Sequence, residues 1–256
     1  MSLLSVRSLT KAFGGVRAID DLSLSIRAGA IHSIIGPNGA GKTTLFNLAT
    51  GIYTPDGGQV LLDGEDITAV PVHRMASLGV SRTFQNLQIF FNMTAAENVM
   101  VGMHRHCDSR FLPAMLRLPR IVRRDAEMAE RAAELMRFVG LADYAGADAD
   151  SMPYGALKRL EIARALATEP RLLLLDEPAA GLNPAETGEI DDLIQKVAGT
   201  GVTVVLVEHD MRLVMGVSEH ILVLVRGTLL AEGTGEEIRH DPNVVAAYLG
   251  EEGRYL

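Results

Sequence analysis

The sequence predicts an α/β protein with a mixed sheet at its core, an antiparallel β subdomain and an inserted α-helical subdomain. Short strand-like runs and turn signals fill the chain to about Val80, where antiparallel and parallel signals are mixed. Residues 93–166 are instead rich in Ala, Met, Leu, Arg and Glu at helical spacing. After Leu166, apolar runs of strand length alternate with helical patterns, which is typical of a parallel sheet covered on both faces.

The individual elements follow from these patterns in chain order. In the first part we expect a helix through Leu45–Ala49 and strands at residues 3–9, 22–26, 30–35 and 59–62. In the middle part, apolar residues at helical spacing predict a helix over Asp125–Val139. The last part is predicted to alternate between strands at 171–175, 202–207 and 221–225 and helices at 184–197 and 211–217. The tail from Thr234 is predicted to form two short helices that are interrupted by Pro242.

The same patterns divide one overall domain into three parts. Residues 1–92 and 167–233 form an α/β body, and residues 93–166 form the helical insert. Residues 234–256 form a C-terminal helical tail.

Composition limits the classes of function. The chain has 256 residues, of which 48% are hydrophobic, so it is long and apolar enough for a substantial core. Its formal charge of −8 argues against nucleic acid as the main partner. Cys107 is the only cysteine, so no internal disulfide is possible. The longest apolar runs, such as Val202–Val207, are too short to span a bilayer, and no signal peptide is evident, so we expect a cytosolic protein that is still able to dock on a membrane protein.

The helical insert contains a group of arginines near Pro113 and Pro119. They are Arg117, Arg120, Arg123 and Arg124. The simplest interpretation is a solvated loop and helix face. The alternative is a contact with anionic lipid headgroups or with an acidic partner.

A phosphate-binding loop is predicted immediately after the strand at 30–35. The segment Gly36-Pro37-Asn38-Gly39-Ala40-Gly41-Lys42-Thr43 fits the pattern G-x-x-x-x-G-K-[ST], between an apolar strand and a helix. Its glycines let successive backbone N–H groups point at phosphate oxygens, and the helix N-terminus adds partial positive charge. Lys42 is expected to bridge the β- and γ-phosphates, Thr43 to bind Mg²⁺ through its hydroxyl, and Thr44 to add a further contact.

A pair of carboxylates ends a later buried strand. Leu172–Leu175 leads directly into Asp176 and Glu177. Ligands bind at the carboxyl ends of strands in open α/β sheets. Asp176 therefore suits the Mg²⁺ shell through water, and Glu177 is expected to polarise the attacking water. Together with the phosphate-binding loop, this pair predicts a nucleoside triphosphatase.

The flanking motifs resemble those of an ATP-binding cassette (ABC) domain, and the resemblance covers essentially the whole chain. Gln85 lies in "SRTFQN" before the helical insert, and His209 lies in "VLVEHDM" at the end of a buried strand. A glycine-containing helix start and "DEP" occur between them in the order of the family. Such a domain has a RecA-like body and an inserted helical subdomain.

Longer sequence segments are most similar to those of the ATPase subunits of branched-chain amino-acid importers. The segments that carry this similarity are "GPNGAGKTTLFNLATG", "RTFQN", "LEIARAL", "LDEPAAGLNPAET", "VEHDMRLVMG" and "AAYLG". Lipopolysaccharide-export ATPases share much of this sequence pattern and are the first alternative. A soluble ABC ATPase that acts on DNA or ribosomes and a nucleotide sensor without hydrolysis are the further alternatives.

The resemblance implies a role for several single residues. Phe13 matches the aromatic residue that stacks on adenine, with Val16 and Arg17 beside the same pocket. Gln85 would join the Mg²⁺ and water shell and report the nucleotide state to the insert. His209 would contact the γ-phosphate and orient water, and Asn183 would lie across the dimer seam.

The family's signature at the start of a helix, roughly Leu-Ser-Gly-Gly-Gln, is altered in this chain. The aligned residues are Met152-Pro153-Tyr154-Gly155-Ala156. Pro153 suits the first turn of a helix, but it removes one hydroxyl and one backbone donor for the γ-phosphate on the other subunit. The N–H groups of Tyr154 and Gly155 remain. Ser151 lies two residues early and is expected to cap the helix instead.

The resemblance also implies the partners. We expect ATP and Mg²⁺ as ligands, a second ABC ATPase subunit in a heterodimer, and a transmembrane permease that works with a solute-binding protein. The permease would dock in a groove beside Gln85, lined by Leu87, Phe90, Phe91, Met93, Glu97 and Asn98. This assembly would lie at the cytoplasmic face of the inner or plasma membrane.

Overall fold

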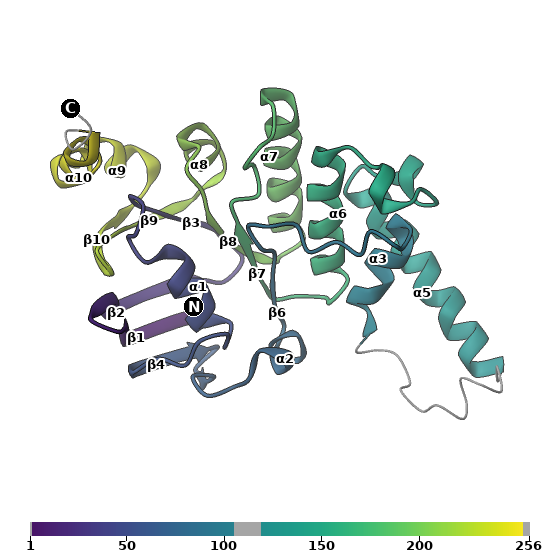
Figure 1. Cartoon of the computed structure of the whole chain (residues 1–256), viewed down its shortest axis with the longest axis horizontal. Helices are drawn as coiled ribbons and strands as arrows, with labels where there is room; N and C mark the ends of the chain where they lie inside the picture. Colours follow the sequence, from purple (N-terminus) through teal and green to yellow (C-terminus); the bar gives the residue numbers. More distant parts are fainter. Residues whose placement is uncertain (1, 105–118, 253–256) are drawn as a thin grey trace. The chain divides into compact units, whose positions relative to one another are not determined.

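The computed structural model describes residues 2–104 and 119–252 (Figure 1). Its residues fall into two compact units. Residues 1–82 and 171–256 make up the first unit, and residues 83–170 make up the second. The sequence patterns place the insert at 93–166, whereas the contacts group a longer segment that already begins at Thr83. Arg117 of the arginine group lies outside the described residues.

The antiparallel sheet of the first unit starts with a long hairpin. Strands β1 (Ser2–Phe13) and β2 (Val16–Arg27) pair around the turn at Gly14 and Gly15, and both are longer than the sequence predicts. Strand β4 (Gly57–Leu62) pairs with β1, and β5 (Glu65–Asp66) pairs with β4. The strand order is β2-β1-β4-β5.

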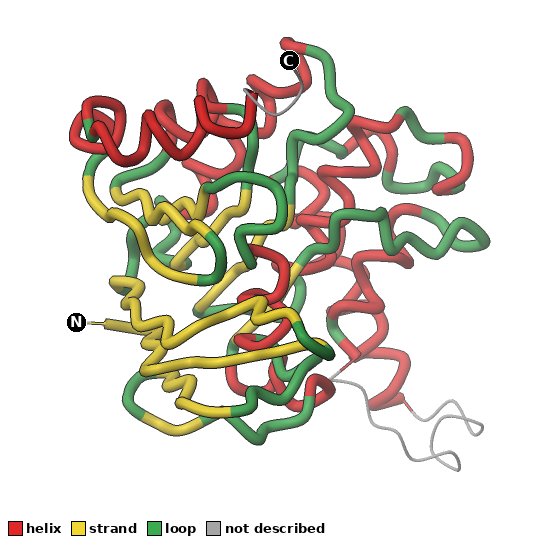
Figure 2. The backbone as a smooth tube through the Cα atoms, turned by 60° about the vertical axis from the view of Figure 1, so that its left-hand side comes forward, coloured by secondary structure: helices red, strands yellow, loops and turns green. Residues whose placement is uncertain are grey.

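The second sheet has six strands in the order β10-β9-β3-β8-β7-β6. Its central strands are the apolar runs of the sequence, namely β3 (Ile31–Ile35), β7 (Leu172–Asp176), β8 (Thr203–Val207) and β9 (His220–Val225). These strands and the edge strand β6 (Val80–Arg82) run parallel, while β10 (Thr228–Gly233) is antiparallel to β9. Because parallel strands end at one edge, the segments that follow β3, β7 and β8 meet there. All strands named in the described chain belong to this unit and are the yellow segments of Figure 2.

The helices of the first unit pack against these two sheets. They are α1 (Lys42–Ala49), α2 (Val72–Met75) with a 3₁₀ turn at Ala76–Leu78, α7 (Pro184–Ala198), α8 (Met211–Val217), α9 (Gly235–His240) and α10 (Pro242–Glu252). Phe46 of α1 is buried in one cluster with Leu9 of β1 and Leu222 of β9, so the helix after the phosphate-binding loop is anchored in the core. A second cluster joins α8, α9 and α10 to the sheet, and Tyr248 of the tail packs against it. Among the described helices, none is both long and apolar enough to cross a membrane.

The second unit is helical. It contains α3 (Ala95–Gly102), α5 (Pro119–Phe138) and α6 (Tyr154–Leu166), with 3₁₀ turns at Ala142–Tyr144 and Ala149–Ser151. Helix α3 packs closely on α6, since a Cβ atom at Gly102 would lie 2.3 Å from the carbonyl oxygen of Arg164. Glycine at this position therefore lets the two backbones approach.

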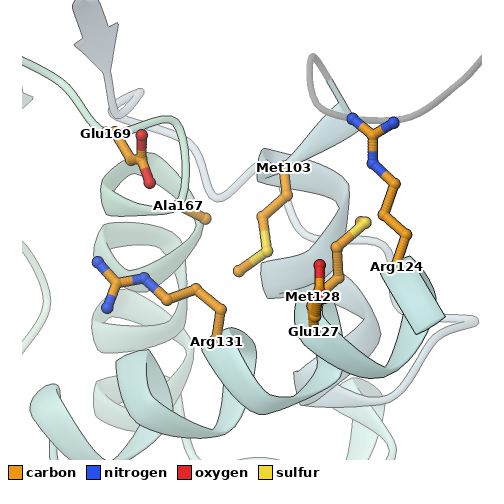
Figure 3. Close-up of a pocket in the computed structure, with 7 residues that line it drawn as sticks. All are labelled: Met103, Arg124, Glu127, Met128, Arg131, Ala167 and Glu169. Atoms are coloured by element: carbon orange, nitrogen blue, oxygen red, sulfur yellow. The ribbon is translucent and has the colours of Figure 1, made fainter.

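A cavity of about 340 Å³ lies in the second unit (Figure 3). Met103 and Met128 line it together with Ala167, and the remaining lining is charged: Arg124, Glu127, Arg131 and Glu169. None of the residues predicted for ATP chemistry lines this cavity.

Candidate nucleotide-binding and hydrolysis site

The phosphate-binding loop joins the buried strand β3 to helix α1 and is shaped by its glycines. Gly36, Gly39 and Gly41 have φ angles of 149°, 77° and 103°. A Cβ atom at Gly36 would lie 2.0 Å from the carbonyl oxygen of Leu224, and one at Gly41 would lie 2.5 Å from that of Ala18. The loop therefore needs glycine both for its backbone angles and for its contact with neighbouring strands.

Several groups of the loop are placed where an anion could bind. Asn38, Gly39 and Thr43 are exposed, Thr44 is half-buried and Ala40 is buried. Helix α1 has no side-chain cap at its N-terminus, where the sequence places phosphate-binding amides. Lys42 folds back over the loop, with its Nζ donating to the carbonyl oxygens of Gly36 at 2.6 Å and Pro37 at 3.0 Å.

Asp176 lies at the end of β7 in a buried ion pair that the sequence did not suggest. Its Oδ2 accepts from the guanidinium of Arg82 at 2.6 Å, and the two side chains are 2% and 6% exposed. The same guanidinium donates to Oδ1 of Asn47 at 2.6 Å and lies 5.4 Å from the ring centroid of Phe46. Arg82 is separated from Asp176 by 94 residues. The only sequence feature that could have pointed to Arg82 was its position inside "SRTFQN", three residues before Gln85.

Glu177 and His209 lie together at the carboxyl ends of neighbouring strands. Oε1 of Glu177 is 2.9 Å from Nε2 of His209. Glu177 has a φ of 50°, and its N–H donates to the carbonyl oxygen of Val207 at 2.9 Å, which holds its backbone to β8. The Glu177 side chain is 16% exposed and that of His209 is 48% exposed, so water can reach the pair. A carboxylate and an imidazole in contact can accept and donate a proton at one position.

Glu208 is a second residue near this pair that sequence analysis missed. It precedes His209 and is buried, and its two carboxylate oxygens accept from the backbone N–H groups of Ala179 at 2.8 Å and His209 at 2.9 Å. Burial is the main cause that raises the pKa of its carboxyl. An acid at the end of an otherwise apolar strand was the only signal in the sequence.

The aromatic side chain predicted for adenine lies at the end of β1. Phe13 is 44% exposed and makes an edge-on contact with Tyr53, with ring centroids 5.2 Å apart. Asp56 fixes this segment, because it accepts from Lys11 at 2.8 Å and from the N–H of Ala12 at 2.7 Å. Two neighbours point to solvent: Val16 is exposed, and Arg17 pairs with Asp20.

Asn183, which the resemblance assigns to the dimer seam, caps helix α7. Its side-chain oxygen accepts from the N–H groups of Ala185 and Glu186 at 2.9 and 3.0 Å. The side chain of Glu186 accepts in return from the N–H of Asn183, which completes a capping box.

Gln85 and the altered signature belong to the second unit. Gln85 is exposed in a bend, and the N–H of the preceding residue, Phe84, donates to the buried carboxylate of Glu161 at 3.3 Å. Burial raises the pKa of Glu161. Pro153 is the N-cap residue of α6, which begins at Tyr154.

The expectation that Ser151 caps this helix is wrong. Its hydroxyl donates instead to the carbonyl oxygen of Asp148 at 2.7 Å, and α6 has no side-chain cap. Ser151 therefore stabilises the preceding 3₁₀ turn. Tyr154 is exposed at the helix start, and Gly155 is buried.

The residues predicted to receive the permease divide into exposed and buried members. Phe90 and Phe91 are 44% and 49% exposed, and Leu87 and Met93 are half-buried. Asn98 is fully buried, because its amide group bonds the backbone of Phe90 in both directions at 2.9 and 3.0 Å. Asn98 therefore holds the loop in place and does not line a surface.

Glu97 is exposed in a capping box at the start of α3. Its carboxylate accepts from the N–H of Thr94 at 2.8 Å, and this bond is the main cause that lowers the pKa of Glu97. The carboxylate is thus ionised and oriented at the end of the exposed segment that contains Phe90 and Phe91.

The donor set fits Mg²⁺ that arrives with a triphosphate. Thr43 offers an exposed hydroxyl, and Asp176 offers a carboxylate of which Arg82 contacts Oδ2. In the part of the chain that the structure describes, no group of three His, Cys, Asp or Glu residues could hold a metal ion by itself. Mg²⁺ prefers such sites, where few protein oxygens are supplemented by substrate phosphates and water.

The fold and this site define an ATPase of the ATP-binding cassette class. Residues 19–180 match the family model of the ABC transporter, and the chain belongs to that family. Within it, residues 228–254 match the model described as "Branched-chain amino acid ATP-binding cassette transporter".

Individual relatives agree with this assignment. The chain is 49% identical to the high-affinity branched-chain amino acid transport ATP-binding protein BraF of Pseudomonas aeruginosa, over 97% of this chain and 98% of the relative. It is 46% identical to LivG of Escherichia coli, a protein with the same description, with the same coverage. These relatives do not favour the lipopolysaccharide-export alternative.

Solved structures show the same fold. A nucleotide-free ATP-binding cassette from an ABC transporter superposes with a TM-score of 0.85 and 34% identity, over 97% of this chain and 99% of the other. A dimeric cassette in a post-hydrolysis state bound to ADP and Pi has a TM-score of 0.76 and 25% identity, over 90% of this chain and 98% of the other.

Proposed function

We propose that the chain is the ATP-hydrolysing motor of an importer of branched-chain amino acids. The observation that carries this proposal is the 2.9 Å contact between Glu177 and His209, which follow the adjacent strands β7 and β8. Strand β8 lies next to β3, which leads into the phosphate-binding loop. The match of residues 228–254 and the names of the two relatives support the solute class. The motor acts at the cytoplasmic face of the membrane, on a separate permease that works with a solute-binding protein.

Each predicted residue has a defined task in the proposed reaction. Adenine stacks on Phe13, and the phosphates bind the N–H groups from Asn38 to Thr44, with Lys42 at the β- and γ-phosphates. Thr43, Gln85 and, through water, Asp176 would hold Mg²⁺, which would supply positive charge to offset that of the phosphates.

Hydrolysis is then a transfer of the γ-phosphoryl group to water. Glu177 polarises a water molecule, whose oxygen forms a bond to the γ-phosphorus while the bond to the bridging oxygen of ADP breaks. His209 orients that water and contacts the γ-phosphate.

The assembly that we propose is a nucleotide-sandwich heterodimer. Each ATP is held between the phosphate-binding loop of one subunit and the signature of the other. Pro153 lacks one hydroxyl and one N–H, and a hydrogen bond to a charged group contributes about 1.5–3 kcal/mol, so this signature should bind ATP about 10- to 100-fold more weakly. A homodimer would carry that defect in both sites, whereas in a heterodimer the partner's signature completes the site on this chain's loop. Hydrolysis should therefore occur mainly on the ATP bound by this chain.

Comparison of two mutants in the reconstituted pair tests this asymmetry. Glu177→Gln should abolish most ATP turnover, and the matching change in the partner subunit should be milder. The opposite ranking would refute the asymmetric assignment. Pro153→Ser should increase ATPase activity of this chain alone, and an unchanged rate would show that the altered signature is harmless.

A phosphate-release assay separates the motor from a nucleotide sensor that does not hydrolyse ATP. The motor releases phosphate in a Mg²⁺-dependent manner that Lys42→Ala and Glu177→Gln both suppress. A chain that binds ATP but releases no phosphate in the complete complex would support the sensor instead.

The permease is proposed to dock on the exposed segment around Phe90 and Phe91, beside Leu87 and the ionised Glu97. Two adjacent exposed phenylalanines suit an apolar docking helix. Phe91→Ser should reduce copurification of the permease with the chain and should leave the affinity for ATP unchanged. Full recovery of the permease with this variant would exclude the segment as the docking site.

A further inference from the structure

The carboxylate of Glu208 connects the two loops that carry Glu177 and His209. Its Oε1 accepts from the N–H of Ala179 at 2.8 Å, and its Oε2 accepts from the N–H of His209 at 2.9 Å. A longer contact of 3.4 Å runs from the N–H of Asp210 to the same Oε2. One donor follows β7 and the other two follow β8, so a single side chain bonds both strand ends.

Burying a carboxylate costs free energy, so a buried carboxylate that only links two loops is unusual. Glu208 is 4% exposed, and a buried carboxylate is stable only when its oxygens accept hydrogen bonds. Glu177 lies close enough to disfavour a second negative charge. The backbone N–H groups that offset these effects all belong to the two loops at the candidate site.

The backbone beside Glu208 needs such support. Glu177 has a φ of 50°, which is unfavourable for a residue with a side chain. On its N-terminal side, the N–H of Glu177 is held by Val207 at 2.9 Å. Two residues later, Glu208 holds the N–H of Ala179. The turn that presents the Glu177 carboxylate is thus fixed at both ends to the end of β8, from which His209 projects.

We propose that Glu208 is a positioning residue that sets the contact between Glu177 and His209. It would act through the backbone of the two loops that carry these residues. The inference rests on the proposed function, because it assumes that this pair performs hydrolysis. It adds that the geometry of the pair depends on one buried carboxylate.

Two substitutions remove the link in different ways. Glu208→Gln keeps the shape, but its NH₂ group must face one of the two backbone donors, so one bond is lost. Glu208→Asp keeps the charge but is one methylene shorter and cannot reach both loops. Asp191→Asn is the matched control, because Asp191 of α7 lies near Glu208 and removing its charge leaves both bonds intact.

Turnover is measured on the chain assembled with its partner ATPase and permease. Both Glu208 variants should lower kcat at least tenfold, with KM for ATP within about twofold of the wild-type value. Asp191→Asn should stay within about twofold in both constants. In a His209→Ala background, Glu208→Gln should cause less than a further twofold loss, since the pair is already broken.

A spectroscopic measurement on the chain alone provides the second readout. The ring nitrogen signals of His209, assigned by their absence in His209→Ala, should move toward those of a free imidazole in both Glu208 variants. This measurement does not depend on ATPase activity. It therefore tests the positioning role of Glu208 even if one variant assembles poorly with the partner subunits.

The outcomes separate the two proposals. If Glu177→Gln leaves turnover unchanged, the proposed function fails and the role of Glu208 fails with it. If Glu177→Gln abolishes turnover but the Glu208 variants keep a normal kcat and a normal His209 signal, only the positioning role is overturned. Equal losses in the wild-type and His209→Ala backgrounds would also overturn it, because they indicate general destabilisation.

Discussion

The buried ion pair between Arg82 and Asp176 allows a quantitative test of how burial determines the contribution of a charge. We consider Arg82→Met, which keeps much of the apolar stem and removes the guanidinium. Asp176 would then remain 2% exposed with its main cation gone. Breaking a buried pair by removing one partner destabilises by about 3–5 kcal/mol, because a charge is left uncompensated.

The chain contains a matched control for this substitution. Arg171 and Asp63 form an ion pair at the same distance of 2.6 Å, but their side chains are 54% and 60% exposed. Exposed pairs contribute about 0–1 kcal/mol, because water solvates the charge that remains. Arg171→Met should therefore lower the free energy of unfolding by less than about 1 kcal/mol. The two variants should differ by at least about 2 kcal/mol.

Urea unfolding followed by circular dichroism measures both losses from the shift of the midpoint at constant slope. If Asp176 belongs to the metal shell as proposed, Mg²⁺ with ATP should recover more stability in Arg82→Met than in the wild type, because Mg²⁺ would then compensate the Asp176 carboxylate. Equal losses in Arg82→Met and Arg171→Met would refute the argument from burial. Equal recovery by Mg²⁺ and ATP in variant and wild type would refute the assignment of Asp176 to the metal shell.

Three further predictions concern other parts of the first unit. Burial lowers the pKa of His32 from 6.5 to about 4. Between these pH values the unfolded chain binds a proton on His32 that the folded chain does not, so the free energy of unfolding should fall by up to about 3 kcal/mol from pH 6.5 to 4. Urea titrations of His32→Gln should lack this contribution of His32 to the pH dependence. Gly36→Ala should destabilise by more than about 2 kcal/mol, because its Cβ would lie 2.0 Å from the Leu224 carbonyl oxygen, whereas Gly29→Ala, with open space around it, should lose only about 1 kcal/mol in the same unfolding assay. Phe13→Ala should weaken ATP binding about tenfold or more by calorimetry, as stacking on a base contributes about 1–3 kcal/mol, and an unchanged affinity would exclude Phe13 from the adenine site.

The central parallel strands were predictable because each is a continuous apolar run. The runs at 171–175, 202–207 and 221–225 agree with β7, β8 and β9 to within one or two residues. Strand β6 was not predicted, because three residues carry too little pattern and pair only through β7. Strands β1 and β2 extend beyond their alternating segments, since pairing with each other stabilises the polar ends.

The candidate site was predictable where a local motif carries the chemistry, and not where contacts cross the chain. The phosphate-binding loop and the acidic strand end are contiguous in sequence. Arg82, by contrast, meets Asp176 across 94 residues, and only the strand order brings them together. Glu208 was hidden because a buried acid beside a predicted histidine has no motif of its own. The cap assigned to Ser151 failed because that residue ends the preceding 3₁₀ turn, where its hydroxyl donates to the carbonyl oxygen of Asp148, and α6 begins only at Tyr154.

The order of the strands explains how Arg82, which the sequence did not suggest, contributes to the candidate site. Along the edge β3-β8-β7-β6, successive strand ends carry the phosphate-binding loop, His209, the pair Asp176 and Glu177, and Arg82. Strand β6 is the sheet edge and has three residues, so its ladder to β7 supplies few hydrogen bonds. Arg82 is the last residue of the first unit, and its ion pair joins that short strand to the carboxylate predicted to face Mg²⁺. Because this ion pair supplements the few hydrogen bonds of β6, Arg82→Met should loosen the end of β6 more than the buried strands beside it.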